Sequence, residues 1–246
     1  MSFTSEIKHF AKELGIHKIG IAQVTTLDDE GKKLKEWLTH GYQGTMEWMN
    51  RNVEKRIDAR TILPDAVSII SVALNYYTPH SHEANAAKGK ISRYAWGDDY
   101  HDILTPKLHT LLQWITDKHP NAKGKVYVDT GPVLEKVWAQ KAGIGWQGKH
   151  TNIISRELGS WIFLGEIILN LELEYDESAI DHCGTCTLCI DACPTEAIIA
   201  PYVLDAKKCI SYATIEHKGE IDSSLTINFD VWLYGCDNCM DVWPWN

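Results

Sequence analysis

The sequence predicts an α/β or α+β sandwich, in which helices cover a sheet, followed by a small cysteine-rich domain. Helical and strand-like hydrophobic patterns alternate through the first 175 residues, and two long apolar runs have the composition of buried strands. All seven cysteines lie beyond position 182. We therefore expect one domain over residues 1–175 and a second over residues 176–246, with the boundary where the composition turns acidic.

The elements of the first domain follow from the spacing of its apolar residues. Residues 5–14 carry apolar side chains at three- and four-residue intervals and end before Gly15, which is typical of an amphipathic helix with a glycine stop. The same reasoning predicts helices over residues 27–40, 107–115 and 133–142. Runs of β-branched and other apolar residues predict strands over residues 18–22, 66–76, 125–128 and 161–171.

Composition narrows the function classes. The chain has 246 residues, 44% hydrophobic and 23% charged, which is enough to bury a proper core. No run of eighteen apolar residues is present, and the first 21 residues lack the order of a signal peptide, so we expect a cytoplasmic protein without a membrane partner. A formal charge of -9 argues against broad, non-specific binding of nucleic acid.

The cysteines carry the strongest signal. Cys183, Cys186, Cys189 and Cys193 form a C-x2-C-x2-C-x3-C-P run, which is the ligand pattern of bacterial ferredoxins. Thiols clustered in an otherwise cysteine-free chain indicate metal binding rather than a disulfide framework. A zinc site normally uses two separated cysteine pairs, so the pattern favours 4Fe-4S clusters and a ferredoxin-like second domain.

The second half of the pattern is incomplete. In bacterial ferredoxins the fourth cysteine of the run ligates the other cluster, so Cys193 joins Cys209, Cys236 and Cys239 in one complete set. The other three cysteines lack a fourth partner, because Trp243 precedes Pro244 where a cysteine is expected. That set could hold a three-iron cluster, a four-iron cluster with another ligand, or no durable cluster. His182 is a conceivable fourth ligand, or simply an exposed linker residue.

Long blocks of the sequence resemble one family, the cobalamin-dependent epoxyqueuosine reductases of tRNA modification, which are related to the reductive dehalogenases. The resemblance covers nearly the whole chain. Two departures are Trp243 in the last motif and the end of the chain at Asn246, beyond which members of the family continue. The blocks are residues 46–77, 92–104 (SRYAWGDDYHDIL), 128–154 (VDTGPVLEKVWAQKAGIGWQGKHTNII), the cysteine run, 209–219 (CISYATIEHKG) and 234–246 (YGCDNCMDVWPWN).

The resemblance implies an oxidoreductase with a cobalamin-binding first domain. It would reduce epoxyqueuosine to queuosine at the wobble position of tRNA, with electrons passing through the 4Fe-4S clusters to cobalamin. It also implies an electron donor of flavodoxin or ferredoxin type, and we expect a monomer. The missing eighth cysteine leads us to expect impaired activity. The alternatives are a degenerate, non-catalytic iron-sulfur electron-transfer protein of the same fold and, with less support, a reductive dehalogenase.

Asp129 is the expected catalytic residue. It follows a predicted strand and precedes a predicted helix, and the resemblance implies that it is the general acid. An acid that holds its proton near neutral pH needs a pKa well above about 3.9, which burial beside a corrin could provide. Without the resemblance, Asp129 reads better as the N-cap of the helix that starts near Pro132.

Two further segments are candidates for cofactor binding through the resemblance. Arg93, Tyr100 and His101 lie in a block rich in aromatic and charged residues, which would otherwise be read as a surface loop. Gly143, Gly145 and Lys149 lie in a glycine-rich segment, whose glycines let the backbone approach a ligand or simply form a helix stop and turn.

One short basic stretch is a candidate tRNA contact. Such charge usually belongs to a solvated helix face, but in a tRNA enzyme it could meet phosphates. The stretch contains Arg51, Lys55, Arg56 and Arg60.

Overall fold

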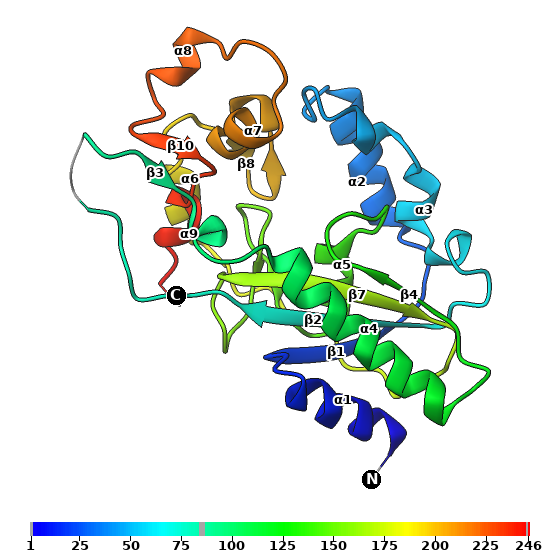
Figure 1. The fold of residues 1–246 in the computed structure, drawn as a ribbon. Helices are drawn as coiled ribbons and strands as arrows, with labels where there is room; N and C mark the ends of the chain where they lie inside the picture. The colour runs from blue at the N-terminus through cyan, green and yellow to red at the C-terminus, as the bar shows by residue number, and fades with distance from the viewer. Residues whose placement is uncertain (1, 84–86, 245) are drawn as a thin grey trace.

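A four-stranded sheet forms the centre of the computed structural model, which describes residues 2–83, 87–244 and 246 (Figure 1). All neighbouring strands are antiparallel, so of the two predicted classes the fold is α+β. The longest register joins the two central strands, from Ser68 opposite Leu169 to Asn75 opposite Ile162. The strand order is β1 (Lys18–Gln23), β2 (Ser68–Asn75), β7 (Ile162–Leu169) and β4 (Gly124–Tyr127).

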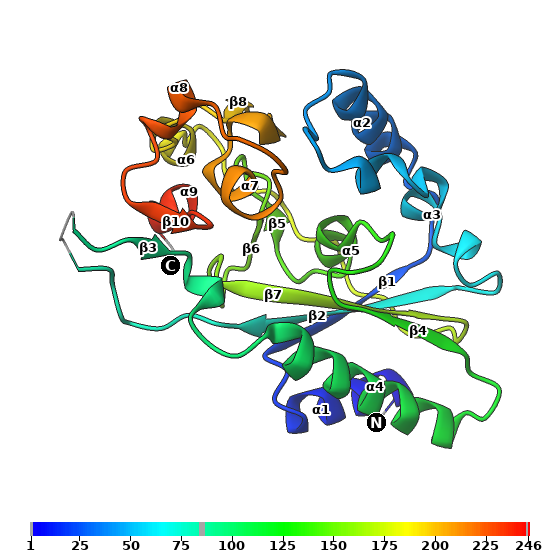
Figure 2. The ribbon, with the colours of Figure 1, turned by 45° about the horizontal axis from the view of Figure 1, so that its top comes forward.

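Helices cover both faces of this sheet (Figure 2). On one face, α1 (Phe3–Glu13) and α4 (Tyr100–Lys118) pack on Ile70 and Val72 of β2. On the other face, α5 (Glu135–Lys141) packs on Ile69 and Ala73. Both faces of β2 are apolar because successive side chains alternate across a strand that is covered on both sides. The predicted sandwich is therefore confirmed.

The packing of α5 depends on one glycine. A Cβ added to Gly20 of β1 would lie 1.8 Å from the carbonyl oxygen of Ala142, at the end of α5. No other residue permits this approach of helix end to strand. The contact fixes the height of α5 above the sheet, and with it the loop that enters the helix.

Most element boundaries agree with the sequence prediction, and α4 is the main difference. The helix begins at Tyr100 and not near residue 107, and it continues through Pro106. Asp99 caps it, because its side chain accepts a hydrogen bond from the backbone N–H of His101. The proline removes one intrahelical hydrogen bond, but buried Leu104 and Leu108 hold both sides of it against the sheet.

Residues 176–246 form a compact region of short elements beside the α5 face of the sheet (Figures 1 and 2). Earlier segments of the chain contact this region at several places, and two of these contacts position it against the sheet domain's connecting elements. Strand β3 (Lys90–Ile91) pairs in parallel with β10 (Trp232–Tyr234), and the indole of Trp37 donates to the carbonyl of Leu204. The elements of the region are α6 (Leu188–Asp191), β8 (Ile198–Ala200), β9 (Val203–Leu204), a 3-10 turn at Ala206–Lys208, α7 (Ile210–Ile215), α8 (Ser223–Thr226), β10 and α9 (Asn238–Asp241).

The remaining elements connect these parts. Among the described residues, no helix combines the length and the apolar character needed to cross a bilayer. The connecting elements are α2 (Asp28–Thr39), α3 (Val53–Ile57), β5 (Trp146–Gln147), β6 (Ile153–Ile154) and 3-10 turns at Glu47–Asn50, Ala59–Thr61 and Arg93–Ala95.

Candidate active site and cluster sites

A cavity of about 530 Å³ lies between the α5 face of the sheet and the cysteine-rich region. One wall comes from the start of β7, the loop that enters α5 and the start of α4. The opposite wall comes from the cysteine segments and α7. Its lining includes Tyr94, Tyr100, Asp129, Glu135, Lys136, His150, Ile153, Ile162, Phe163, Leu164, Cys193, Cys209, Tyr212, Cys236 and Cys239. Two distant parts of the sequence therefore meet at a single site.

Asp129 lies on the sheet side of this cavity, in a strained turn. Its φ is 58°, in the left-handed region that few non-glycine residues adopt. The hydroxyl of Tyr100 donates a hydrogen bond to Asp129 Oδ2 over 2.9 Å, and Tyr100 is itself stacked on Phe163. Burial and the nearby charge of Asp129 raise the pKa of Tyr100, so the phenol keeps its proton and remains a donor.

The N-cap reading of Asp129 is wrong. The cap residue of α5 is Leu134, without a side-chain hydrogen bond, and Asp129 stands five residues before it. Its backbone N–H instead donates to Glu135 Oε1 over 2.6 Å. The Asp129 side chain is 66% exposed, so the protein alone does not supply the burial that the sequence analysis expects such an acid to need.

Glu135 and Glu166 form a carboxyl pair beside Asp129 that the sequence analysis missed. Burial, together with the charge of Asp129, raises the pKa of Glu135 to about 7. Glu166 is fully buried on β7, where Ser71 donates to Oε1 while Oε2 has no donor. Burial, with the nearby carboxyl of Glu135 as the next cause, raises the pKa of Glu166 well above its ordinary value, so this buried carboxyl holds a proton.

His150 adds a neutral donor to the cavity. Its Nδ1 accepts a hydrogen bond from the backbone N–H of Asn152 over 3.1 Å, which leaves the proton on Nε2. Nε2 is buried and has no partner. Burial lowers the pKa of His150 to about 4, with a smaller contribution from the positive charge of Lys136. The site therefore presents a donor that a bound group with an exposed oxygen would satisfy.

Four of the predicted cluster ligands face the same cavity. Cys193, Cys209, Cys236 and Cys239 all belong to its lining, and all seven cysteines are free thiols. Burial raises the pKa of Cys236 to about 12, so cluster binding at this set would release protons. No three His, Cys, Asp or Glu side chains of the described part of the chain converge on a single ion position. A cubane distributes its thiolates over separate irons, and four thiols at one cavity fit it.

The other three cysteines lie outside the cavity lining, and two of them, Cys183 and Cys186, pack in the same cluster as Trp243. Cys183 and Trp243 belong to one buried apolar cluster with Trp146 and Ile154, and Cys186 packs against it. The buried ammonium of Lys149 donates to the carbonyl oxygens of Gly184 and Cys186 within the same loop.

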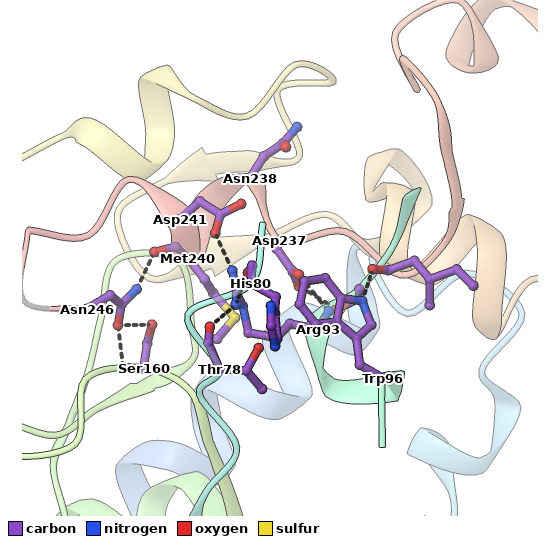
Figure 3. Close-up of polar contacts among 12 residues, drawn as sticks. Thr78, His80, Arg93, Trp96, Ser160, Asp237, Asn238, Met240, Asp241 and Asn246 are labelled. Carbon is purple, nitrogen blue, oxygen red and sulfur yellow. Dashed lines mark hydrogen bonds and ion pairs between the residues drawn. The ribbon is translucent and has the colours of Figure 1, made fainter. Parts of the chain in front are cut away.

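Several residues that were predicted to bind a cofactor instead make contacts within the protein. Arg93 lies outside the cavity lining, where its guanidinium donates to the carbonyls of Thr78 and His80 (Figure 3). Cβ atoms added to Gly143 and Gly145 would meet the backbone carbonyls of Glu177 and Ile154. His101 lies behind Asp129, with Nε2 4.0 Å from Oδ2. Of the predicted cofactor residues, only Tyr100 belongs to the lining.

The basic stretch is not a uniform solvated face. Arg56 is buried with its guanidinium 5.5 Å from the ring centroid of Trp48, and Arg60 is bound to Asp58 and Thr26. Arg51 is exposed and Lys55 half-buried.

Comparison with known proteins decides the family. The model described as "Epoxyqueuosine reductase QueG, DUF1730" matches residues 56–130, and the "4Fe-4S double cluster binding domain" matches residues 182–246. An epoxyqueuosine reductase of Atelocyanobacterium thalassa (isolate ALOHA) is 46% identical, covering 100% of this chain and 80% of the relative. One from Synechocystis sp. is 50% identical, covering 93% and 79%. The chain belongs to the epoxyqueuosine reductase family.

Solved structures agree with this assignment. An epoxyqueuosine reductase with an epoxyqueuosine-modified tRNA-Tyr stem loop has a TM-score of 0.91 at 36% identity, and 98% of this chain covers 64% of that chain. The Bacillus subtilis epoxyqueuosine reductase, with an aspartate-bearing catalytic loop swung out of the active site, has a TM-score of 0.90 at 35% identity, with the same coverage. A reductive dehalogenase shares the fold at 16% identity and a TM-score of 0.53.

Proposed function

We propose that this chain reduces epoxyqueuosine to queuosine at the wobble position of tRNA, using 4Fe-4S clusters and cobalamin. The observation that carries the proposal is the cavity with four cysteine thiols on one wall and Asp129 on the other. Electrons and a proton can thus reach one substrate from opposite sides. The relative solved with a modified tRNA stem loop supports tRNA as the substrate.

Cobalamin suits the cavity for two reasons. Ile153, Ile162 and Leu164 provide apolar surface for a flat macrocycle. The unpaired Nε2–H of His150 can donate a hydrogen bond to an amide oxygen on a side chain of cobalamin. Lys136, which donates to Asn152 over 2.7 Å, is a second polar group of the lining. When bound, cobalamin supplies the two-electron nucleophile that opens the epoxide.

The protein's part is to supply protons. Converting an epoxide to an alkene and water takes up two electrons and two protons. Asp129 is the proposed donor to the departing oxygen, held by the Tyr100 hydroxyl. Glu135 lines the same cavity and is the proposed source of the second proton, with Glu166 behind it as its partner. The aspartate-bearing catalytic loop of the Bacillus subtilis relative supports the role of Asp129.

The chain spans 80% of the length of the Atelocyanobacterium thalassa relative and 79% of that of the Synechocystis relative. We keep three expectations as proposals: a flavodoxin- or ferredoxin-type electron donor, a monomer, and a cytoplasmic location.

The test is turnover on tRNA that carries epoxyqueuosine, under anaerobic conditions with a chemical reductant and added cobalamin. Mass spectrometry of the nucleosides should show queuosine formation that requires both cobalamin and reconstituted clusters. Cobalamin binding without any queuosine would favour the non-catalytic electron-transfer reading.

A further inference from the structure

The two halves of the cysteine pattern have the same local backbone. Helices α6 and α9 each begin one residue before a cysteine and end two residues after it. In each half the residue after the helix cap donates its N–H to a carbonyl three positions earlier, at 3.2 Å for Cys193 and 3.1 Å for Trp243. A proline follows each of them. Trp243 therefore stands at the backbone position that Cys193 occupies in the first half.

The side chains of Cys193 and Trp243 each lie with the cysteines of the other half of the pattern. Cys193 lines the cavity with the three late cysteines. Trp243 is 7% exposed and lies in the buried cluster that contains Cys183. Its ring centroid is 6.0 Å from that of Trp146. The indole thus occupies the place from which a fourth thiolate would reach the first set.

An indole there cannot replace a thiolate. Its nitrogen is a donor only and has no lone pair for iron. The Nε1 of Trp243 is buried and without a hydrogen-bond partner, whereas the indole of Trp146 interacts with Cys183. A buried, unpaired N–H costs about 1–3 kcal/mol. The site therefore combines three thiols with one donor that lacks an acceptor.

We propose that Cys183, Cys186 and Cys189 hold a three-iron cluster of the [3Fe–4S] type, covered at its open corner by the indole of Trp243. Three thiolates match three irons. At the corner that lacks iron, sulfides bridge only two metals and can accept the Trp243 N–H. A fourth iron would need both a ligand and the volume that the ring fills. The inference rests on cluster binding and not on the tRNA reaction, so the two can fail separately.

Two neighbouring side chains, those of Asp181 and His182, carry atoms that could ligate a fourth iron. The carboxylate of Asp181 accepts hydrogen bonds from the N–H of Cys183, at 2.7 Å, and from the hydroxyl of Tyr202. His182 is exposed, and its ring meets Trp146 edge-on at 4.9 Å. Ligation by His182 is therefore the competing outcome that an experiment has to distinguish.

The position of the altered cluster defines its effect. The complete set lines the cavity, whereas the three-thiolate set lies outside it, beside the Lys149 ammonium. The three-iron cluster would thus be the outer one of the two, in the sense that it lies farther from the cavity. Fewer thiolates and a fixed positive charge both favour the reduced form, so its potential would be raised. Electron transfer from it toward the cavity then becomes less favourable.

The experiment compares the full chain with three variants after anaerobic reconstitution. The parent should contain about seven irons per chain, and Trp243→Cys about eight. The oxidised parent should give the paramagnetic resonance signal of a three-iron cluster, which Trp243→Cys should lose. Trp243→Phe, which keeps the bulk but removes the N–H, should keep the signal with a shifted potential. His182→Ala should resemble the parent.

Several results would overturn the inference. Mössbauer spectra of the parent with two four-iron clusters would do so, and loss of one of them in His182→Ala would identify the histidine as ligand. A parent with about four irons and no three-iron signal would mean that the first set stays empty. A three-iron signal that persists in Trp243→Cys would show that the tryptophan does not determine the cluster type. Queuosine formation, measured separately, does not enter these comparisons.

Discussion

The hydroxyl of Tyr100 donates a hydrogen bond to Asp129 Oδ2 across 2.9 Å, and this contact joins the start of α4 to the loop before α5. Tyr100 is held by stacking on Phe163, with ring centroids 4.2 Å apart. The strained turn at Asp129 is thereby fixed on a residue of the central sheet. An acid that must meet a substrate in one geometry benefits from such support.

Replacing Asp129 with Asn should abolish most turnover without disturbing the turn. Asn tolerates the left-handed conformation, so the φ of 58° is retained, while the transferable proton is lost. We expect queuosine formation to fall by about 100-fold or more, since general acids contribute about 10²–10⁴-fold. Cluster content and cobalamin binding, followed by absorbance, should stay at the parent level. Turnover within a few-fold of the parent would remove Asp129 from the mechanism.

Tyr100→Phe is the matched test of positioning. It keeps the ring on Phe163 and removes only the hydroxyl that holds Asp129. We expect a smaller loss, about 10-fold, appearing in kcat rather than in KM for tRNA. An equal loss in Tyr100→Phe and Asp129→Asn would instead indicate that the phenol delivers the proton.

Glu135 should make the stability of the protein depend on pH. Its pKa is about 7 in the folded chain and about 4.3 in an unfolded one, so folding favours the protonated form. Its contribution is fully present below about pH 4.3 and is lost as the pH rises toward 7. Within that window the free energy of unfolding should fall by up to about 1.4 kcal/mol per pH unit relative to Glu135→Gln.

Chemical denaturation of parent and Glu135→Gln at several pH values between 5 and 8 measures this difference. Gln keeps an oxygen that can accept the Asp129 N–H, so the loop should be retained. Parallel stability curves for the two proteins would show that Glu135 is ionised throughout and cannot supply a proton.

The central sheet could be predicted because burial dictates its apolar pattern. The apolar runs around Ile70 and Ile167 are stable only when buried in the core, so their composition and length predict two central strands. The pairing of β3 with β10 could not be predicted, since each strand has only two or three residues and the paired residues Lys90 and Trp232 are far apart in the sequence. The start of α4 at Tyr100 differs from the predicted start at residue 107 because the helix continues through Pro106, a residue that usually ends a helix.

The site could be predicted only where its residues form a recognisable pattern in the local sequence. The cysteine spacing marks its ligands, and the resemblance pointed to Asp129. Glu135 and His150 owe their shifted pKa values to tertiary burial, which no local pattern records. Glu166 did leave a signal, as the one charge in the apolar run of residues 161–171. A carboxyl in a buried strand needs a proton or a partner, and that argument would have found it.

Arg51 is an exposed arginine of the basic stretch at which a contact with tRNA phosphate can be tested. Reversing Arg56 would bury a carboxylate, and Arg60 already binds Asp58, so neither variant reports cleanly on tRNA. Arg51→Glu should weaken tRNA binding several-fold and reduce the slope of log affinity against log salt by about 1. Lys33→Glu on α2, also exposed, is the control for net charge. Equal salt slopes for both variants and the parent would exclude a phosphate contact at Arg51.

Arg93 should govern how firmly the last cluster segment is held. Its backbone N–H and the hydroxyl of Ser92 donate to the buried carboxylate of Asp237, between Cys236 and Cys239 (Figure 3). Its guanidinium lies 4.6 Å from the ring centroid of Trp161 and 4.8 Å from that of Trp96. A second fastening is the Asn246 side chain, which accepts from the N–H and hydroxyl of Ser160.

Arg93→Ala removes the guanidinium but keeps the backbone donor, so the segment should loosen without detaching. We expect a loss of about 2–4 kcal/mol in the free energy of unfolding, because two carbonyl acceptors lose a charged, buried partner. The cluster on the cavity side should then lose iron to a chelator faster than the outer one, as followed by Mössbauer spectra. Arg93→Lys, which keeps the charge but not the planar fork, should be intermediate. Uniform iron loss from both clusters would mean that Arg93 stabilises the whole fold and not this segment.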